Sequence, residues 1–194
     1  KDGVKFERVS ERPVMAPEVE WEKVAVMCPH VLWDDVRHVY RMWYSGGEQY
    51  EPTAIGYAES SDGVNWKKYE GNPIFSSDVN IDWERNKTAA CHVLKWDGWY
   101  YMFYIGFIHV DRAAIGLARS KDGITGWERY SQNPIIAPDK GKFDEKAVYK
   151  PYVMKNDTGW IMWYNEAMYI PDSEEIVREQ IGVAYLKREN LWNE

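Results

Sequence analysis

The feature that most constrains the fold of this chain is an internal repeat with a period of about 60 residues. The anchors of the repeat are MWYSG from Met42, MFYIG from Met102 and MWYNE from Met162. A second motif follows each anchor and starts at Ile55, Ile115 and Ile181, where it reads IGYAES, IGLARS and IGVAYL. A fixed period of this length indicates one supersecondary unit that the chain uses three times.

Each unit consists of short segments rich in Val, Ile, Tyr and Trp, separated by turn signals such as Asp62-Gly63 and Asp122-Gly123. Such segments are typical of β-strands. Helical periodicity is not sustained anywhere except in a short stretch near residues 174–180. Each unit is therefore predicted to be a four-stranded meander, and the fold to be an all-β propeller with one meander per blade. Two stacked sandwiches are the alternative, but a sandwich has no reason to repeat at a fixed period.

Composition narrows the range of partners. The aromatic content of 15% suits either repeated β-sheet cores or sugar-binding faces, and the net charge of −7 argues against nucleic acid or an anionic membrane. No apolar run approaches the roughly 18 residues of a membrane span. No motif for a cofactor or a metal is present, and the two cysteines, Cys28 and Cys91, are too few for a disulfide framework. Nothing in the sequence indicates the compartment.

The repeat divides the chain into blades of one propeller domain or half-propeller. Residues 21–76 and 83–137 are predicted to form complete blades, whereas residues 143–194 stop where their fourth strand should begin. Residues 1–20 resemble the last part of a unit, because Phe6 aligns with Trp66. They are therefore predicted to be an outer strand that has been displaced to the N-terminus.

Three blades are too few to close a ring, since known propellers have about four or more. One interpretation is that the chain is a piece of a longer five-bladed protein. The other is a homodimer, in which two copies join head to tail and complete a six-bladed ring. Each copy would then lend its first strand to the last blade of the other, and the displaced strand favours this interpretation.

The repeat resembles a known group of proteins. The combination of MWYSG with IGYAESSDGVNWKKYEGNPIF is similar to the repeat of the five-bladed propeller glycosidases, which include glycoside hydrolase families 43, 32 and 130. The resemblance covers nearly the whole chain and implies a carbohydrate-active protein that binds a sugar in a central funnel. Residues such as Met42, Trp43 and Tyr44 are framework positions for packing between blades, so the resemblance specifies architecture more than activity.

The resemblance also indicates where catalytic carboxylates are expected. In this group they lie on the innermost strand of successive blades, often directly before a proline. The matching positions here are Cys28, Ala90 and Lys150, and none of them is acidic. The two-carboxylate machinery of glycoside hydrolysis is thus absent from its expected places. Three explanations are open. The carboxylates lie on blades that this chain does not contain, or the catalytic residues occupy other positions, or the chain is a catalytically degenerate relative that only binds a glycan or a protein.

Strand alternation suggests which side chains line the funnel. It predicts that Val26, Cys28 and His30 share one face, and that His92 and Tyr152 point inward from the equivalent position of the next two blades. The candidate sugar-binding residues are His30, His92, Lys150, Tyr152 and Arg112. The alternative is that the two histidines form hydrogen bonds across the channel and hold the blades in place.

Three residues are candidates for acid or base catalysis: Glu166, Glu145 and Asp111. Glu166 stands where the other units have glycine, so it is expected to project over the funnel mouth. Glu145 does not recur in the other units, and Asp111 lies in a loop at the same rim. By contrast, the acids that recur in every unit, Glu22, Glu84 and Asp144, are predicted to be structural. Two carboxyl groups about 5 to 9 Å apart in one pocket would favour hydrolysis over binding.

Overall fold

The computed structural model describes residues 6–47, 52–109, 111–169 and 177–192, which form antiparallel sheets and one turn of 3-10 helix, η1 (Glu20–Glu22). The first sheet contains β1 (Ala25–Asp34), β2 (Val39–Gly47), β3 (Ala54–Ser60), β4 (Lys67–Lys68) and β5 (Phe75–Ser76). The second contains β6 (Lys87–Trp96), β7 (Trp99–His109), β8 (Arg112–Ser120) and β9 (Glu128–Arg129). The third contains β10 (Ala147–Asn156), β11 (Gly159–Tyr169) and β12 (Val177–Leu186).

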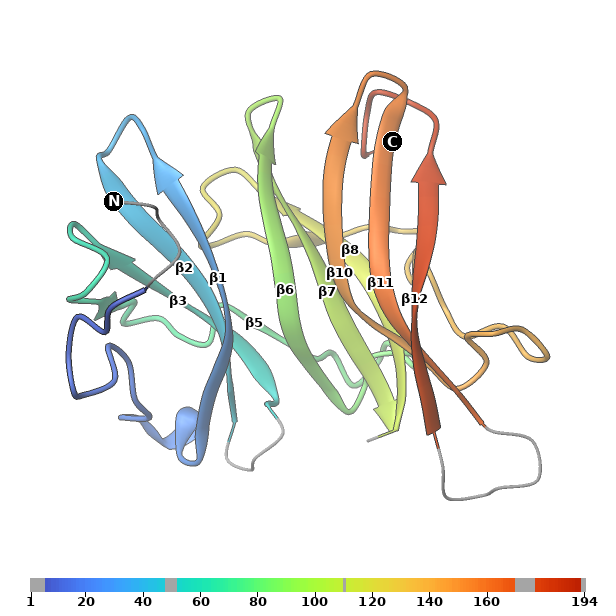
Figure 1. Ribbon diagram of the computed structural model, residues 1–194, viewed down its shortest axis with the longest axis horizontal. Coiled ribbons are helices and arrows are strands. Elements are labelled where there is room, and N and C mark those ends of the chain that lie inside the picture. The colour runs from blue at the N-terminus through green and yellow to red at the C-terminus, as the bar shows by residue number, and fades with distance from the viewer. Residues whose placement is uncertain (1–5, 48–51, 110, 170–176, 193–194) are drawn as a thin grey trace.

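The three sheets follow one another as blades in sequence order, from β1 on the left of Figure 1 to β12 on the right. The first strand of each sheet is the inner one, and β6 contacts both β1 and β10. This arrangement confirms the all-β propeller architecture that the repeat predicts. In the part of the chain described, no helix has the length and apolar character needed to cross a membrane.

The blades are held together by the aromatic repeat. Trp43, Ile55 and Tyr57 of the first blade pack against Tyr100 and Met102 of the second. The second and third blades repeat this packing with Phe103, Ile115, Leu117, Val153, Trp160 and Met162. Successive side chains of a strand point to opposite faces, so one anchor motif serves two interfaces. The framework role predicted for this motif agrees with the packing.

Each inner strand is interrupted by a β-bulge at the same place. The register shifts between Met27 and His30 in β1, and equivalent shifts occur in β6 and β10. Val26 pairs with Gly46, whereas His30 pairs with Trp43 on the opposite face of the sheet. The expectation that Val26, Cys28 and His30 share one face is therefore wrong, because the extra residue of a bulge reverses the alternation of side chains.

The N-terminal segment lies against the first blade. Met15 packs beside Trp21 and Trp66, and the backbone carbonyl of Ala16 accepts a hydrogen bond of 2.6 Å from Lys68 Nζ. Residues 6–19 form no strand, and among the described residues the third sheet ends at β12. The outer strand assigned to residues 1–20 and the blade boundaries stay predictions.

Candidate functional site

The three bulges place one residue of each inner strand in a left-handed backbone conformation. Its φ is 53° at Cys28, 36° at Ala90 and 50° at Lys150. The left-handed conformation costs an L-residue roughly 1 to 2 kcal/mol, and residues strained in this way cluster at functional sites. The same strain at matching positions of three blades marks this level of the inner strands as the candidate site.

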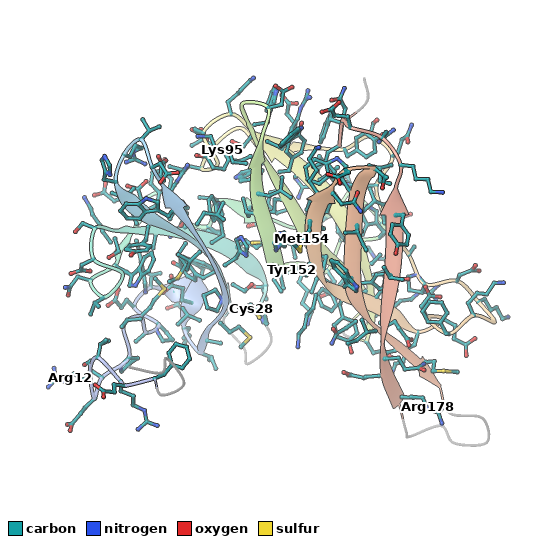
Figure 2. The ribbon with its side chains drawn as sticks, turned by 45° about the horizontal axis from the view of Figure 1, so that its top comes forward. Arg12, Cys28, Lys95, Tyr152, Met154 and Arg178 are labelled. Atoms are coloured by element: carbon teal, nitrogen blue, oxygen red, sulfur yellow. The ribbon has the colours of Figure 1, made fainter. Side chains whose placement is uncertain are left out.

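Electrostatics connects the bulges across the blades. Burial raises the pKa of the Cys28 thiol, and the positive charge of Lys150 opposes this rise from the third blade. Burial also raises the pKa of Cys91, and Cys28 adds to that rise. Cys28 and Tyr152 both lie in the central part of Figure 2, on β1 and β10. Cys28, Cys91 and Lys150, which come from the three inner strands, therefore lie close enough for Cys28 to be influenced by Lys150 and Cys91 by Cys28.

The predicted inward-facing residues do come together, as a row that runs from blade to blade. His30 Nε2 lies 2.7 Å from the carbonyl oxygen of Val93. The His30 ring is 4.6 Å from the His92 ring, which is 4.8 Å from the Tyr152 ring, measured between centroids. Each histidine therefore contacts the next blade, an arrangement that favours the framework role. Tyr152 ends the row and is 54% exposed.

Burial keeps both histidines neutral. Burial lowers the pKa of His30. It also lowers the pKa of His92 to about 4; the neighbouring His30 adds to this decrease, and a hydrogen bond with the Val153 backbone opposes it. A histidine whose pKa is lowered by folding stabilises the protein above its unfolded pKa of 6.5. This contribution is lost as the pH falls from that value towards 4.

We therefore expect the effect of replacing His92 to depend on pH. His92→Gln should reduce the free energy of unfolding by about 1 to 3 kcal/mol at pH 7.5, through the loss of a buried hydrogen bond. The difference between the two proteins should shrink at pH 4.5, where the wild type has lost part of the contribution. Urea unfolding at both pH values measures this, with the exposed His38 replaced in the same way as a control. An equal difference at both pH values would contradict the expectation.

The candidate residues at the rim lie in separate places. Asp111 and Arg112 are exposed where β7 turns into β8. Glu145 is half-buried, and its Oε2 accepts a hydrogen bond of 3.0 Å from the Gly141 amide within its own loop. Lys150 is exposed on β10. Within the described ranges, no three His, Cys, Asp or Glu side chains gather as metal ligands.

Glu166 is fully buried, so the expectation that it projects over the funnel mouth is wrong. In the second blade a Cβ atom at Gly106 would come within 2.3 Å of the Trp83 ring, which packs on this glycine. The third blade has Glu166 and Phe143 at these two positions, and Phe143 is half-exposed. Glu166 is tolerated where the other blades need glycine because no indole ring lies over it.

The recurrent acids anchor the blades, as predicted. Glu84 accepts a hydrogen bond of 2.5 Å from the Tyr104 hydroxyl and one of 2.6 Å from Arg129 Nε. Glu22, Tyr44 and Lys68 repeat this arrangement in the first blade. Each acid lies in the segment that precedes the inner strand, and each cation lies on the fourth strand of the blade. We call this set the acid–tyrosine–cation anchor.

The third blade has an incomplete anchor. Asp144 and Tyr164 stand at the acid and tyrosine positions, but no fourth strand supplies a cation in the described chain. Asp144 Oδ1 and both carboxylate oxygens of Glu166 are buried and accept no hydrogen bond. Burial raises the pKa of Glu166, and the charge of Asp144 adds to this rise. One sequence signal could have revealed that Asp144 and Glu166 lack a cation. Lys68 and Arg129 occupy matching positions in the two complete units, and the third unit has no such residue in the described chain.

The fold and the family match place the chain among the carbohydrate-active propellers of the glycosidase-like class. Residues 1–190 match the model of glycoside hydrolase family 130, described as β-1,4-mannooligosaccharide phosphorylase. The chain belongs to this family.

Individual relatives agree. The chain is 30% identical over 215 residues to a 1,2-β-oligomannan phosphorylase of a Thermoanaerobacter species, covering 97% of this chain and 70% of the relative. A solved glycoside hydrolase superposes with a TM-score of 0.69 at 22% identity, over 95% of this chain and 54% of that one. The β-1,2-mannobiose phosphorylase of Listeria innocua, solved with β-1,2-mannobiose, gives 0.67 at 19% identity, over 93% and 46%. The chain thus spans about half the length of these solved proteins.

Proposed function

We propose that this protein binds a manno-oligosaccharide in the funnel between its inner strands. The observation that carries the proposal is the matched set of left-handed bulges at Cys28, Ala90 and Lys150. A bulge re-aims the side chains of a strand and is common beside active sites. Two of the relatives named above are, by their names, an oligomannan phosphorylase and a mannobiose phosphorylase solved with mannobiose, which supports mannose as the sugar.

The accessible residues at this level suit a sugar. Lys150 offers an ammonium group to hydroxyl or anionic oxygens, and Tyr152 offers both a ring face and a hydroxyl. A few precisely placed polar groups are typical of small-ligand sites. His30 and His92 support this surface from behind, since their rings contact the neighbouring blades.

We further propose that these blades are catalytically degenerate. Hydrolysis needs two carboxyl groups at one bond, whereas phosphorolysis uses phosphate as the nucleophile and still needs a proton donor. The bulge positions contain no acid, and Glu166 is buried in the third blade. The remaining acids, Asp111 and Glu145, lie in separate loops.

Binding and turnover are tested together. We expect calorimetry with β-1,2- and β-1,4-mannobiose to detect binding, and Lys150→Ala or Tyr152→Ala to weaken it at least 10-fold without a change in melting temperature. Lys67→Ala, on an exposed outer strand, is the matched control. Aryl mannosides should show no turnover with or without phosphate. Binding that survives both funnel variants would contradict the site, and turnover lost in Asp111→Asn or Glu145→Gln would contradict degeneracy.

We also propose that two copies of this chain assemble head to tail into a ring. The last blade exposes apolar residues whose equivalents are covered by a following blade. Ile181 is 76% exposed, whereas Ile55 and Ile115 are fully buried, and Val183 is 47% exposed against 3% for Leu117. A second copy would cover this face with its first blade and so extend the arc of inner strands.

A further inference from the structure

We propose that a cleft on the face opposite the funnel is a second sugar-binding site, which takes one neutral pyranose residue of a mannan chain. The cleft has a volume of about 520 Å³ and lies between the second and third blades. The lining residues that carry the argument are Asp97, Trp99, Tyr101, Arg119, Asn190 and Trp192. The choice of mannan rests on the function proposed above, whereas the cleft itself rests on the side chains around it.

The cleft lies far from the bulges of the inner strands. Asp97 and Trp99 flank Gly98 in the turn that joins β6 to β7, whereas the bulge of β6 lies at Ala90. A strand rise of about 3.3 Å per residue separates Ala90 from this turn by roughly 20 Å. In Figure 1 the turn lies at the top of the molecule, and β7 runs from it to the bottom, where β8 begins. A ligand in the cleft would therefore leave the funnel free.

Arg119 is held in the cleft by two indole rings. Its Cζ atom lies 4.1 Å from the ring centroid of Trp99 and 4.2 Å from that of Trp192. Its Nε donates a hydrogen bond of 2.9 Å to Glu128. The Trp192 ring is itself packed against Tyr130 of the second blade, with 5.0 Å between the centroids. The guanidinium group is thus oriented before a ligand binds, which lowers the entropic cost of binding.

The other polar atoms of the cleft are available to a ligand. Among the described residues, no group accepts a hydrogen bond from the terminal nitrogens of Arg119, and the Asp97 carboxylate and the Tyr101 hydroxyl form none. Burial raises the pKa of Tyr101; the charge of Arg119 opposes this rise, and that of Asp97 adds to it. Both charged groups therefore act on the same hydroxyl. Asn190 contributes an amide to the same cleft.

A neutral polyol suits these groups better than an ion does. A simple anion would face the Asp97 carboxylate and a cation would face the Arg119 guanidinium, so each would meet a like charge. Sugar hydroxyls both donate and accept, so neighbouring hydroxyls can bind the guanidinium and the carboxylate at once. The rings of Trp99 and Trp192 offer apolar surface to the C–H groups of the sugar. This combination indicates a pyranose ring.

The repeat does not require this cleft. Tyr101 pairs with Arg119 across β7 and β8, and the matching pair of the first blade is Arg41 with Glu59. Arg41 is only 3% exposed, and its Nη1 lies 3.7 Å from the Asp34 carboxylate. The first blade therefore satisfies its cation with protein groups. The second blade has a tyrosine at that place and turns its cation towards the cleft.

Nuclear magnetic resonance of the indole N–H groups tests whether the cleft is occupied. In a Tyr152→Ala chain, which weakens the funnel site, β-1,4-mannohexaose should shift the signals of Trp99 and Trp192. Each signal is assigned by replacing that residue with Phe. Trp127 is the internal control, because its indole nitrogen is buried at the packing between the first two blades. Its signal should not move.

Two conservative changes should remove the site. Asp97→Asn keeps the left-handed turn conformation (φ 48°), which Asn also adopts readily, and Tyr101→Phe removes only a hydroxyl. Together they should abolish the Trp99 shift and raise the apparent dissociation constant for soluble glucomannan, in affinity gel electrophoresis, by about 5-fold or more. Asp157→Asn, in the equivalent turn of the third blade, is the matched control. Asn190→Ala, at an exposed position, repeats the test without changing a buried residue.

The outcomes separate the cleft from the funnel. We expect the cleft variants to bind glucomannan more weakly and to bind mannobiose, in calorimetry, as the unchanged chain does. Unchanged glucomannan binding in these variants, or no shift of Trp99 and Trp192, would overturn the cleft and leave the funnel standing. Glucomannan binding that depends on Asp97, in a chain that binds no mannobiose, would overturn the funnel and keep the cleft.

Discussion

Replacing Arg129 by Met is expected to reduce the free energy of unfolding by about 3 to 5 kcal/mol, the typical cost of leaving one partner of a buried ion pair uncompensated. Glu84 is fully buried, and its only cationic partner in the described structure is Arg129. The variant would leave the carboxylate with the Tyr104 hydroxyl alone. Urea unfolding at pH 7 measures the loss.

A rescue variant separates the charge effect from the loss of packing. Adding Glu84→Gln to Arg129→Met removes the uncompensated charge, so part of the stability should return. Arg37→Met is the control for a surface pair, since Arg37 and Glu59 are both partly exposed and such pairs contribute about 0 to 1 kcal/mol. Equal losses for Arg37→Met and Arg129→Met would mean that the anchor is no more important than a surface ion pair.

The opposite result is expected at Glu166, where Gln should stabilise the chain at neutral pH. The folded pKa of Glu166 is raised above its ordinary value of 4.5. A carboxyl group of this kind costs nothing below its unfolded pKa, and its cost grows as the pH rises to the folded pKa and stays constant above it. Glu166→Gln should therefore gain on the order of 1 kcal/mol or more at pH 7, because the neutral amide carries no buried charge. The gain should vanish near pH 4.

This experiment has a matched control. Glu145→Gln is the matched control, because Glu145 is half-buried and already accepts a hydrogen bond. Glu166→Gln that destabilises the chain at pH 7, or a gain that persists at pH 4, would show that the carboxylate is satisfied in the folded state.

The sequence predicts much of this fold because the relevant signals are local. A period of about 60 residues, turn glycines at Gly63 and Gly123, and alternating aromatic residues were sufficient for strands, meanders and blades. Recurrence also separated structural acids from unusual ones: Glu22 and Glu84 recur, and both form anchors with a tyrosine and a cation. The three units of the chain can be compared with one another, so this distinction needs no sequence of a related protein.

The candidate site was less predictable because it depends on pairing and burial. Strand alternation placed Val26 and His30 on one face, but the bulge at Cys28 puts them on opposite faces. A bulge is a property of two paired strands, so the inner strand alone does not reveal it. The sequence did bring His30, His92 and Tyr152 together correctly, since equivalent positions of a repeat stay equivalent whichever way they face.

By itself, then, the sequence determined the all-β repeat, the packing role of the anchor motifs and the likeness to propeller glycosidases. Only the tertiary structure decided that Glu166 is buried and that its carboxylate lies close enough to Asp144 to be influenced by that charge. The physical reason is that secondary structure follows from the spacing of neighbouring residues. The burial of a carboxylate depends instead on which distant ring or strand covers it, here the position where the second blade has Trp83 and the third has Phe143.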